Sequence, residues 1–184
     1  MRVIGGKYGG RHLASFKASH LRPTSDRVKE SLFNILGTRV EGSRVLDLFA
    51  GTGNLSIEAH SRGASQVVSV EKHPSSIAII RKNQELLGIK AGIEIVRSDV
   101  LKYLKNFEGE PYDLVLVDPP FTEKMAHDVM VALSTSRVGD NRTVVAIESA
   151  GRERLDDVYQ EWTRIDSRDY GDKILSFFER KARD

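Results

Sequence analysis

The stretch VLDLFAGTGN, residues 45–54, decides the fold of this chain. It opens with apolar residues typical of a buried strand and runs into Gly51 and Gly53, which let the backbone turn sharply and approach a ligand closely. A helix is expected after this turn, at residues 55–62, and its first backbone N–H groups are available to the same ligand. This order of strand, glycine turn and helix predicts a ligand-binding α/β unit.

The alternation continues toward the carboxyl terminus. Continuously apolar strands are expected at 44–49, 66–71, 93–97, 113–117 and 143–148. Helices are expected at 55–62, at 74–88, through Tyr103 and at 125–133, and residues 163–181 are typical of a hairpin around Gly171. The pattern predicts a Rossmann-like α/β fold: a seven-stranded, mostly parallel sheet with one antiparallel strand and helices on both faces.

The amino-terminal segment differs from the rest in pattern and in charge. Residues 2–6 and 10–15 predict a strand pair broken by glycines, and 23–36 predicts a helix with an apolar stripe of Val28, Leu32, Ile35 and Leu36. Residues 1–29 hold seven Lys and Arg against one Asp, 7 − 1 = +6, whereas the whole chain carries +2. This arm predicts a polyanionic partner such as nucleic acid, with a solvated basic tail as the alternative.

The bulk composition is that of one globular domain. The chain has 184 residues, 40% of them hydrophobic and 29% charged, and no cysteine, which excludes disulfides and thiolate metal sites. No signal core and no run near ~20 apolar residues is present. We expect a single cytoplasmic domain, 1–184, with an extension at 1–37 and a core at 38–184, working as a monomer without a metal.

Acidic residues stand at four successive strand ends. Asp47 lies just inside the first strand, Glu71 ends the second, and Asp99 and Asp118 follow the third and fourth. Ligands of open α/β sheets bind outside the carboxyl ends of the strands, where a carboxylate at Glu71 suits ribose hydroxyls and Asp99 suits an adenine amine. Taken singly, Glu71 and Asp99 also suit helix caps. Taken together and in order, the four acids predict a nucleoside site.

The nucleoside is expected to carry positive charge. The glycine run lacks the third glycine of a dinucleotide fingerprint, because Ser56 stands in its place. A carboxylate at Asp47 repels a pyrophosphate and attracts a cation. S-adenosylmethionine has an ammonium and a sulfonium and no phosphate, so the acidic site favours it as the cofactor.

The fourth strand ends in an unusual turn within LVLVDPPFTE, residues 114–123. Pro119 and Pro120 fix their own φ and hold the residues before them extended, so the turn is stiff. It presents the Asp118 carboxylate as an acceptor beside the Phe121 ring. Alone, such a turn also fits a strand-terminating loop with a solvated Asp.

These motifs resemble a known family. VLDLFAGTGNLSIEAHSRGA with VDPPF is similar to class I S-adenosylmethionine-dependent methyltransferases that act on exocyclic amines, and RVIGGKYGGRHL with LRPTSDRVKESLFNIL narrows the resemblance to the RsmD-type 16S ribosomal RNA (guanine-N(2))-methyltransferases. The resemblance covers nearly the whole chain and departs from the family pattern at Asn54. It implies that three groups of residues line the cofactor. The methionine part would lie against Asp47, Phe49, Gly51 and Gly53, the ribose against Glu71, and the adenine against Asp99 and Val100.

The resemblance implies that Asp118, Pro119, Pro120 and Phe121 hold the target base. Asp118 and the Pro119 carbonyl would grip the amine and localise its lone pair, while Phe121 would stack on the base. The arm would contact ribosomal RNA or the assembling small subunit. Its expected RNA-binding residues are Arg2, Lys7, Arg11, Arg22, Arg27 and Asn34. Because the turn serves either amine, an adenine-N(6) methyltransferase of DNA or RNA stays open, as does an RNA-binding assembly factor without turnover.

Overall fold

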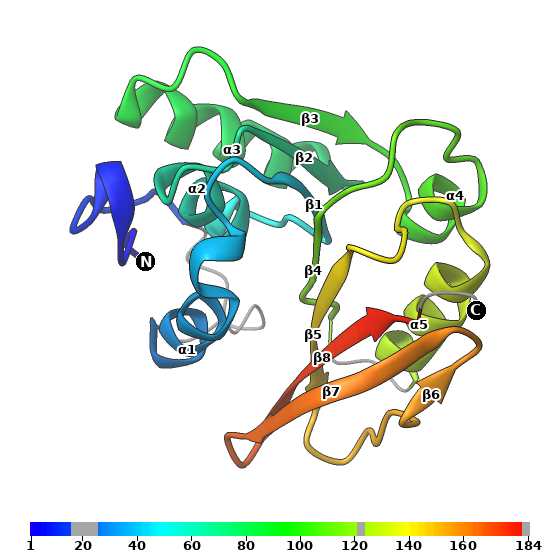
Figure 1. Cartoon of the computed structure of the whole chain (residues 1–184). Helices are drawn as coiled ribbons and strands as arrows, with labels where there is room; N and C mark the ends of the chain where they lie inside the picture. The colour runs from blue at the N-terminus through cyan, green and yellow to red at the C-terminus, as the bar shows by residue number, and fades with distance from the viewer. Residues whose placement is uncertain (16–25, 121–123, 182–184) are drawn as a thin grey trace.

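The computed structural model describes residues 1–15, 26–120 and 124–181, and its strands and helices alternate along the chain (Figure 1). The helical elements are η1 Gly6–Tyr8, α1 Asp26–Leu36, η2 Gly37–Arg39, α2 Asn54–Ser61, α3 Pro74–Leu87, α4 Val100–Lys105 and α5 Met125–Thr135. The strands are β1 Arg44–Leu48, β2 Gln66–Glu71, β3 Ile93–Arg97, β4 Leu114–Val117, β5 Val144–Ala150, β6 Val158–Tyr159, β7 Trp162–Asp169 and β8 Lys173–Arg180.

All eight strands form one sheet in the order β3-β2-β1-β4-β5-β8-β7-β6. Strands β1 to β5 are parallel, and β8 pairs antiparallel with both β5 and β7. The predicted fold class and terminal hairpin are confirmed. The prediction of seven strands was wrong, because the sheet has eight. The additional strand is β6, which has two residues and pairs antiparallel with β7. A strand that short leaves no periodic pattern in a sequence.

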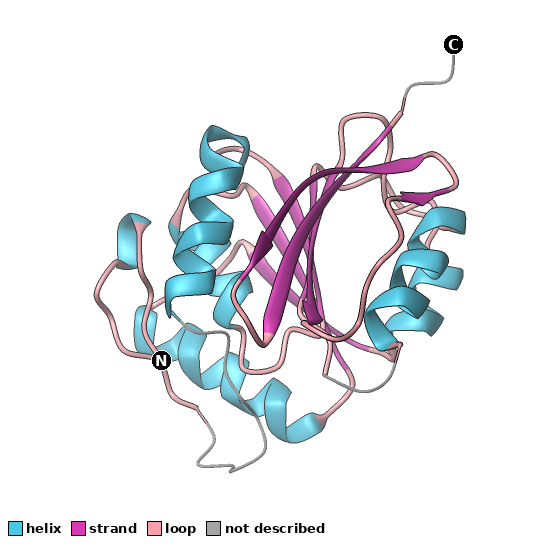
Figure 2. Cartoon of the chain, turned by 90° about the horizontal axis from the view of Figure 1, so that it is seen from below, coloured by secondary structure: helices cyan, strands magenta, loops and turns pink. Residues whose placement is uncertain are grey.

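Helices cover both faces of the sheet (Figure 2). One buried cluster joins residues of α1, α2 and α3 to one face, among them Phe33 and Ile57. A second cluster joins α4 and α5 to the other face, and Leu104 and Met130 belong to it. This two-sided cover explains why the parallel strands are apolar throughout rather than alternating. Within the described ranges, no helix is long and apolar enough to cross a membrane.

The amino-terminal segment is less regular than predicted. Instead of two strands, residues 1–13 form a loop closed by one antiparallel bridge between Arg2 and His12, with η1 at its tip. Helix α1 begins, in the described part of the chain, at Asp26, and the expected start at 23–25 lies outside the described residues. Its buried face contains Phe33 rather than Ile35, which is 37% exposed.

Candidate functional site

The predicted site residues of the core meet at one edge of the sheet. Strands β1, β4 and β2 are parallel neighbours, so the loop after β1, the turn after β4 and Glu71 at the end of β2 all lie at the carboxyl edge. Asp99 follows β3, the next strand, at the same edge. The parallel register therefore assembles, from four separate segments, the group of residues that the sequence predicts.

The loop after β1 has a backbone that favours glycine. Phe49, Gly51 and Gly53 all have positive φ, at 64°, 55° and 82°. At Gly53 there is also little room for a side chain, because a Cβ there would lie 3.2 Å from Ile80 of α3. A non-glycine residue with positive φ is uncommon and often marks a functional site, which singles out Phe49.

Glu71 fixes this loop to the end of β2. Its Oε2 accepts a hydrogen bond from the Gly51 N–H at 2.8 Å, and its Oε1 accepts one from the His73 N–H at 2.8 Å. The sequence did not indicate this second role. An ionised carboxylate has about four acceptor positions, so both oxygens keep capacity for ribose hydroxyls.

Asp99 caps helix α4, which was the alternative that the sequence left open. Its Oδ1 accepts from the N–H groups of Leu101 and Lys102, at 3.0 and 3.2 Å. One oxygen makes both bonds, and the side chain is exposed at the edge, so capping leaves Oδ2 for a ligand. Val100, the first residue of α4, is buried against the sheet.

Burial strongly perturbs the carboxyl group of Asp47. It is 1% exposed, and its Oδ2 accepts a 2.5 Å hydrogen bond from Ser56, whose hydroxyl also lies 2.7 Å from that of Ser69. Within the described residues its Oδ1 has no hydrogen-bond partner. Burial raises the pKa of Asp47 to about 7, opposed by the Ser56 bond and reinforced by the charges of Asp118 and Glu71.

The raised pKa of Asp47 predicts that the free energy of unfolding depends on pH, and that Asp47→Asn removes this contribution. Between the unfolded pKa near 3.8 and the folded pKa of about 7, the folded chain holds the extra proton, so the free energy of unfolding falls as pH rises. At 1.36 kcal/mol per pKa unit, the wild type should lose about 2–3 kcal/mol relative to Asp47→Asn between about pH 5 and about pH 8. Urea unfolding of both proteins at the two pH values measures this difference, and a constant difference would contradict the shifted pKa.

The turn after β4 carries the expected acceptors. Asp118 is half-buried and close enough to Asp47 for its charge to raise the pKa of that group. Pro119 is buried and Pro120 exposed, so the turn is anchored on one side only. Phe121, expected to stack on the base, lies outside the described residues.

The arm residues lie in two different places. The Arg2 guanidinium pairs with Asp26 at 2.9 Å. The Lys29 ammonium donates both to the Arg2 carbonyl and to Asn54, the first residue of α2, so Arg2 lies near the start of that helix. Arg11 instead donates to the carbonyl of Leu86, in the last turn of α3. Lys7 is next to Tyr8, whose N–H bonds Ser61 at the end of α2. A crossover helix runs back toward the amino edge of a parallel sheet, so Lys7 and Arg11, beside the last turns of α2 and α3, lie away from the edge that contains Asp118.

Helix α1 presents its predicted polar face outward. Arg27 and Asn34 are exposed, as is Glu30 between them. The Arg27 guanidinium lies 5.7 Å from the ring centre of Tyr170, in the β7–β8 turn. Arg22 lies outside the described residues. Their contact with RNA stays a prediction.

A buried ionic cluster that the sequence analysis missed ties the arm to the core. The Lys29 ammonium lies 3.2 Å from Glu58 and donates to Asn54 at 2.7 Å, and both Lys29 and Glu58 are fully buried. Burial lowers the pKa of Lys29, while Glu58 opposes that shift. A signal was present, because Lys29 is three and four residues before Leu32 and Phe33, on the apolar face. Asn54, where the sequence departs from the family pattern, therefore has a hydrogen-bond partner in this chain, Lys29.

Asn83 makes a second link between the arm and the cofactor loop. It is fully buried in α3, its Oδ1 accepts from the Ala14 N–H at 2.7 Å, and its Nδ2 donates to the carbonyls of Ala14 and Thr52 at 3.1 Å. Thr52 lies between the two glycines of the loop. Residues 1–15 are thus docked on α2 and α3 rather than extending as a basic tail.

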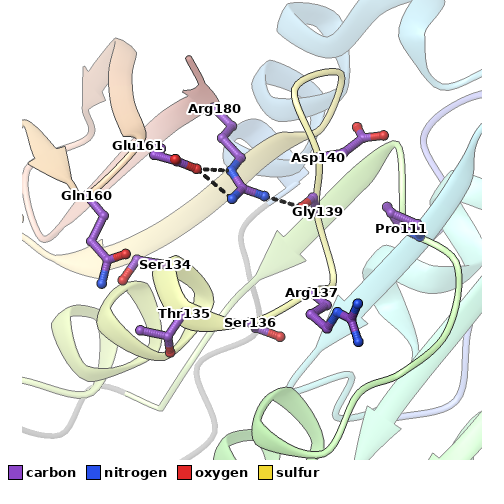
Figure 3. A pocket seen from close by; sticks show the side chains of 10 residues that line it. All are labelled: Pro111, Ser134, Thr135, Ser136, Arg137, Gly139, Asp140, Gln160, Glu161 and Arg180. Atoms are coloured by element: carbon purple, nitrogen blue, oxygen red, sulfur yellow. Dashed lines mark hydrogen bonds and ion pairs between the residues drawn. The ribbon is translucent and has the colours of Figure 1, made fainter. Parts of the chain in front are cut away.

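A separate hollow of about 590 Å³ lies at the opposite edge (Figure 3). Its lining includes Pro111 and Gly139, which precede β4 and β5, so it opens at the amino ends of the strands. Arg180 points into it but is held by Glu161 at 2.5 Å and by the Gly139 carbonyl at 2.9 Å. Its charge is already compensated, and ligands of such sheets bind at the other edge. Within the described residues, no group of three or more His, Asp or Glu side chains could hold a metal.

The chain is similar to a family of bacterial proteins over nearly its whole length. The family model described as Conserved hypothetical protein 95 matches residues 1–179. The Ribosomal RNA small subunit methyltransferase D of Escherichia coli K12 is 32% identical over 183 residues, covering 99% of this chain and 91% of that protein. The protein of the same name from Haemophilus influenzae is 37% identical over 135 residues, covering 72% of this chain and 70% of that one.

Solved structures agree with this similarity. A putative methyltransferase from Escherichia coli superposes with a TM-score of 0.87 at 30% identity, covering 100% of this chain and 99% of that one. A putative methylase from Haemophilus influenzae gives a TM-score of 0.82 at 28% identity and covers 98% of both chains.

Proposed function

Because the chain belongs to the RsmD family of ribosomal RNA small subunit methyltransferases, we propose that it methylates the exocyclic N2 amine of a guanine in 16S ribosomal RNA. It is an S-adenosylmethionine-dependent RNA methyltransferase. The observation that carries methylation of an amine is the position of Asp118 and the buried Pro119 beside the glycine loop, at the carboxyl edge of the sheet, and the resemblance to the family supports guanine as the base.

The described residues fit S-adenosylmethionine, which supplies an electrophilic methyl group when bound. The buried Asp47 oxygen without a partner in the described chain suits the ammonium or sulfonium of that cofactor. Gly51 and Gly53 open the backbone beside it, Glu71 would accept from the ribose, and Asp99 with Val100 would hold the adenine. Phe49 would border the methionine part.

The turn after β4 would orient the amine. An exocyclic guanine amine is a poor nucleophile, because its lone pair is delocalised into the ring. The Asp118 carboxylate and the Pro119 carbonyl would accept hydrogen bonds from its two N–H groups and aim the nitrogen lone pair at the methyl group. Prolines fix the spacing of these acceptors before the base arrives, and Asp118 is the candidate acceptor for the released proton. The base must be unpaired or flipped out to reach this turn.

The core and the amino-terminal extension would have different functions. Residues 38–184 would bind the cofactor and carry Asp118, and residues 1–37 would contribute RNA contacts through Arg2, Arg27 and Asn34. We propose a monomer that acts in the cytoplasm, where ribosomal RNA or the assembling small subunit is available.

Nucleoside analysis tests the target base. Purified protein, S-adenosylmethionine and small-subunit ribosomal RNA from a strain lacking this protein should yield N2-methylguanosine in digests read by mass spectrometry. Small subunits from the same strain form a second substrate arm. N6-methyladenosine would establish the adenine alternative, and cofactor uptake without any methylated nucleoside in either arm would favour an assembly factor.

A further inference from the structure

The loop after β5, Gly151 to Arg154, follows a strand that is parallel to β4 and in register with it, Val117 opposite Ile147. The loop and Asp118 therefore lie at the same edge of the sheet. This position matters because Lys7 and Arg11, two of the expected RNA contacts of the arm, lie beside the last turns of α2 and α3, away from this edge. A base held at Asp118 needs its flanking phosphates to be held nearby.

The loop is fixed at both sides. The Gly151 N–H donates to the Asp172 carbonyl at 2.9 Å, and a Cβ on Gly151 would lie 2.5 Å from the Gly171 carbonyl oxygen, so only glycine fits against the β7–β8 turn. On the other side, Glu153 Oε1 accepts from the His127 N–H at 3.0 Å, in the first turn of α5. The loop backbone is therefore set by contacts with two different elements.

The acids and the arginines of this loop differ in their contacts, because the acids bond to the protein whereas the arginines are exposed to solvent. The three acids within and just after the loop each have a contact: Glu153 with α5, Asp156 with the His127 ring at 3.9 Å, and Asp157 with Arg164 at 3.4 Å. Arg152 and Arg154 are exposed, and no carboxylate of the described chain lies within 4.0 Å of either. Two guanidinium groups on a fixed backbone, without a partner carboxylate among the described residues, suit phosphate oxygens.

This surface continues to helix α1. The β7–β8 turn that holds Gly151 also carries Tyr170, whose hydroxyl bonds Ser31 and whose ring faces Arg27. Arg27, Arg152 and Arg154 therefore lie along one connected path at the edge that contains Asp118. We propose that Arg152 and Arg154, continued by Arg27, form a phosphate-binding surface for the RNA strand that carries the target base. This proposal rests on the proposed RNA methyltransferase function.

Salt-dependent binding tests the surface. Arg152→Ala/Arg154→Ala should reduce the slope of log affinity against log salt by about 1.4–1.8, the sum of ~0.7–0.9 per lost phosphate contact. Filter binding to purified small-subunit ribosomal RNA and to purified small subunits, from about 50 to about 200 mM salt, measures it. Arg152→Lys/Arg154→Lys keeps both charges and should keep most of the slope. S-adenosylmethionine affinity should not change in either variant.

Lys105→Ala/Arg137→Ala is the matched control. It also removes two exposed charges, but at the other edge of the sheet, and should leave the RNA slope unchanged. A wild-type slope in the Arg152→Ala/Arg154→Ala variant would overturn the surface while leaving the methyltransferase assignment intact. Equal slope losses in this variant and the control would overturn it too, because they would indicate a net-charge effect. A wild-type protein that binds neither RNA nor subunits would overturn both the surface and the proposed substrate.

Discussion

Asp118→Ala is expected to lose at least about 10²–10³ in the rate of the methyl-transfer step, the usual cost of removing one preorganised hydrogen-bonding group. Asp118 follows a buried strand and stands on a turn stiffened by two prolines, so its carboxylate is positioned before the base arrives. Asp118→Asn keeps one acceptor oxygen near the same position and should retain measurably more activity.

Single-turnover rates at saturating cofactor measure this difference, because they separate the chemical step from product release. Glu108→Ala, an exposed carboxylate before β4, is the control and should be fully active. Both Asp118 variants should still bind S-adenosylmethionine. Equal losses for Asn and Ala would identify an essential carboxylate base, and a fully active Ala variant would reduce the turn to a structural element.

Glu58→Ala is expected to lower the free energy of unfolding by about 3–5 kcal/mol, the range for removing one partner of a buried ion pair. Glu58 is fully buried and accepts from the N–H groups of Ile4 and Gly5 and from Arg62, each at 2.8 Å, beside the Lys29 ammonium. Its loss leaves the buried Lys29 ammonium without its counter-charge and two backbone donors without their acceptor. For a domain of this size the midpoint of thermal unfolding should fall by about 6–20 °C.

Urea unfolding with a check of the m-value measures this loss, and hydrogen exchange of residues 1–15 shows whether the arm undocks first. Glu58→Gln keeps one acceptor oxygen and should lose less. Glu85→Ala, exposed on α3, is the control and should stay within about 0.5 kcal/mol of the wild type. A wild-type stability for Glu58→Ala would mean that this cluster does not anchor the arm.

Local patterns allowed most of the fold and the core site to be predicted. The strand and helix order follows from apolar runs and glycine positions that lie within about ten residues of one another. The site at the carboxyl edge follows from the same pattern, since parallel strands bring their ends together whatever their sequence separation. The exceptions in the fold are β6, whose two residues pair only because the β7 strand lies beside them, and residues 1–13, where a single bridge stands in place of the predicted strand pair.

The sequence by itself determined the α/β fold, the glycine loop, the acid at each strand end and the family, because each is written in adjacent residues or fixed spacings. Only the tertiary structure decided which charges remain available. It buried Lys29 against Glu58, which are 29 residues apart, and placed Lys7 and Arg11 beside the last turns of α2 and α3. It left Arg152 and Arg154 exposed at the edge of Asp118. A charge count assigns the same value to a buried and an exposed cation, whereas burial and through-space partners set what each one binds.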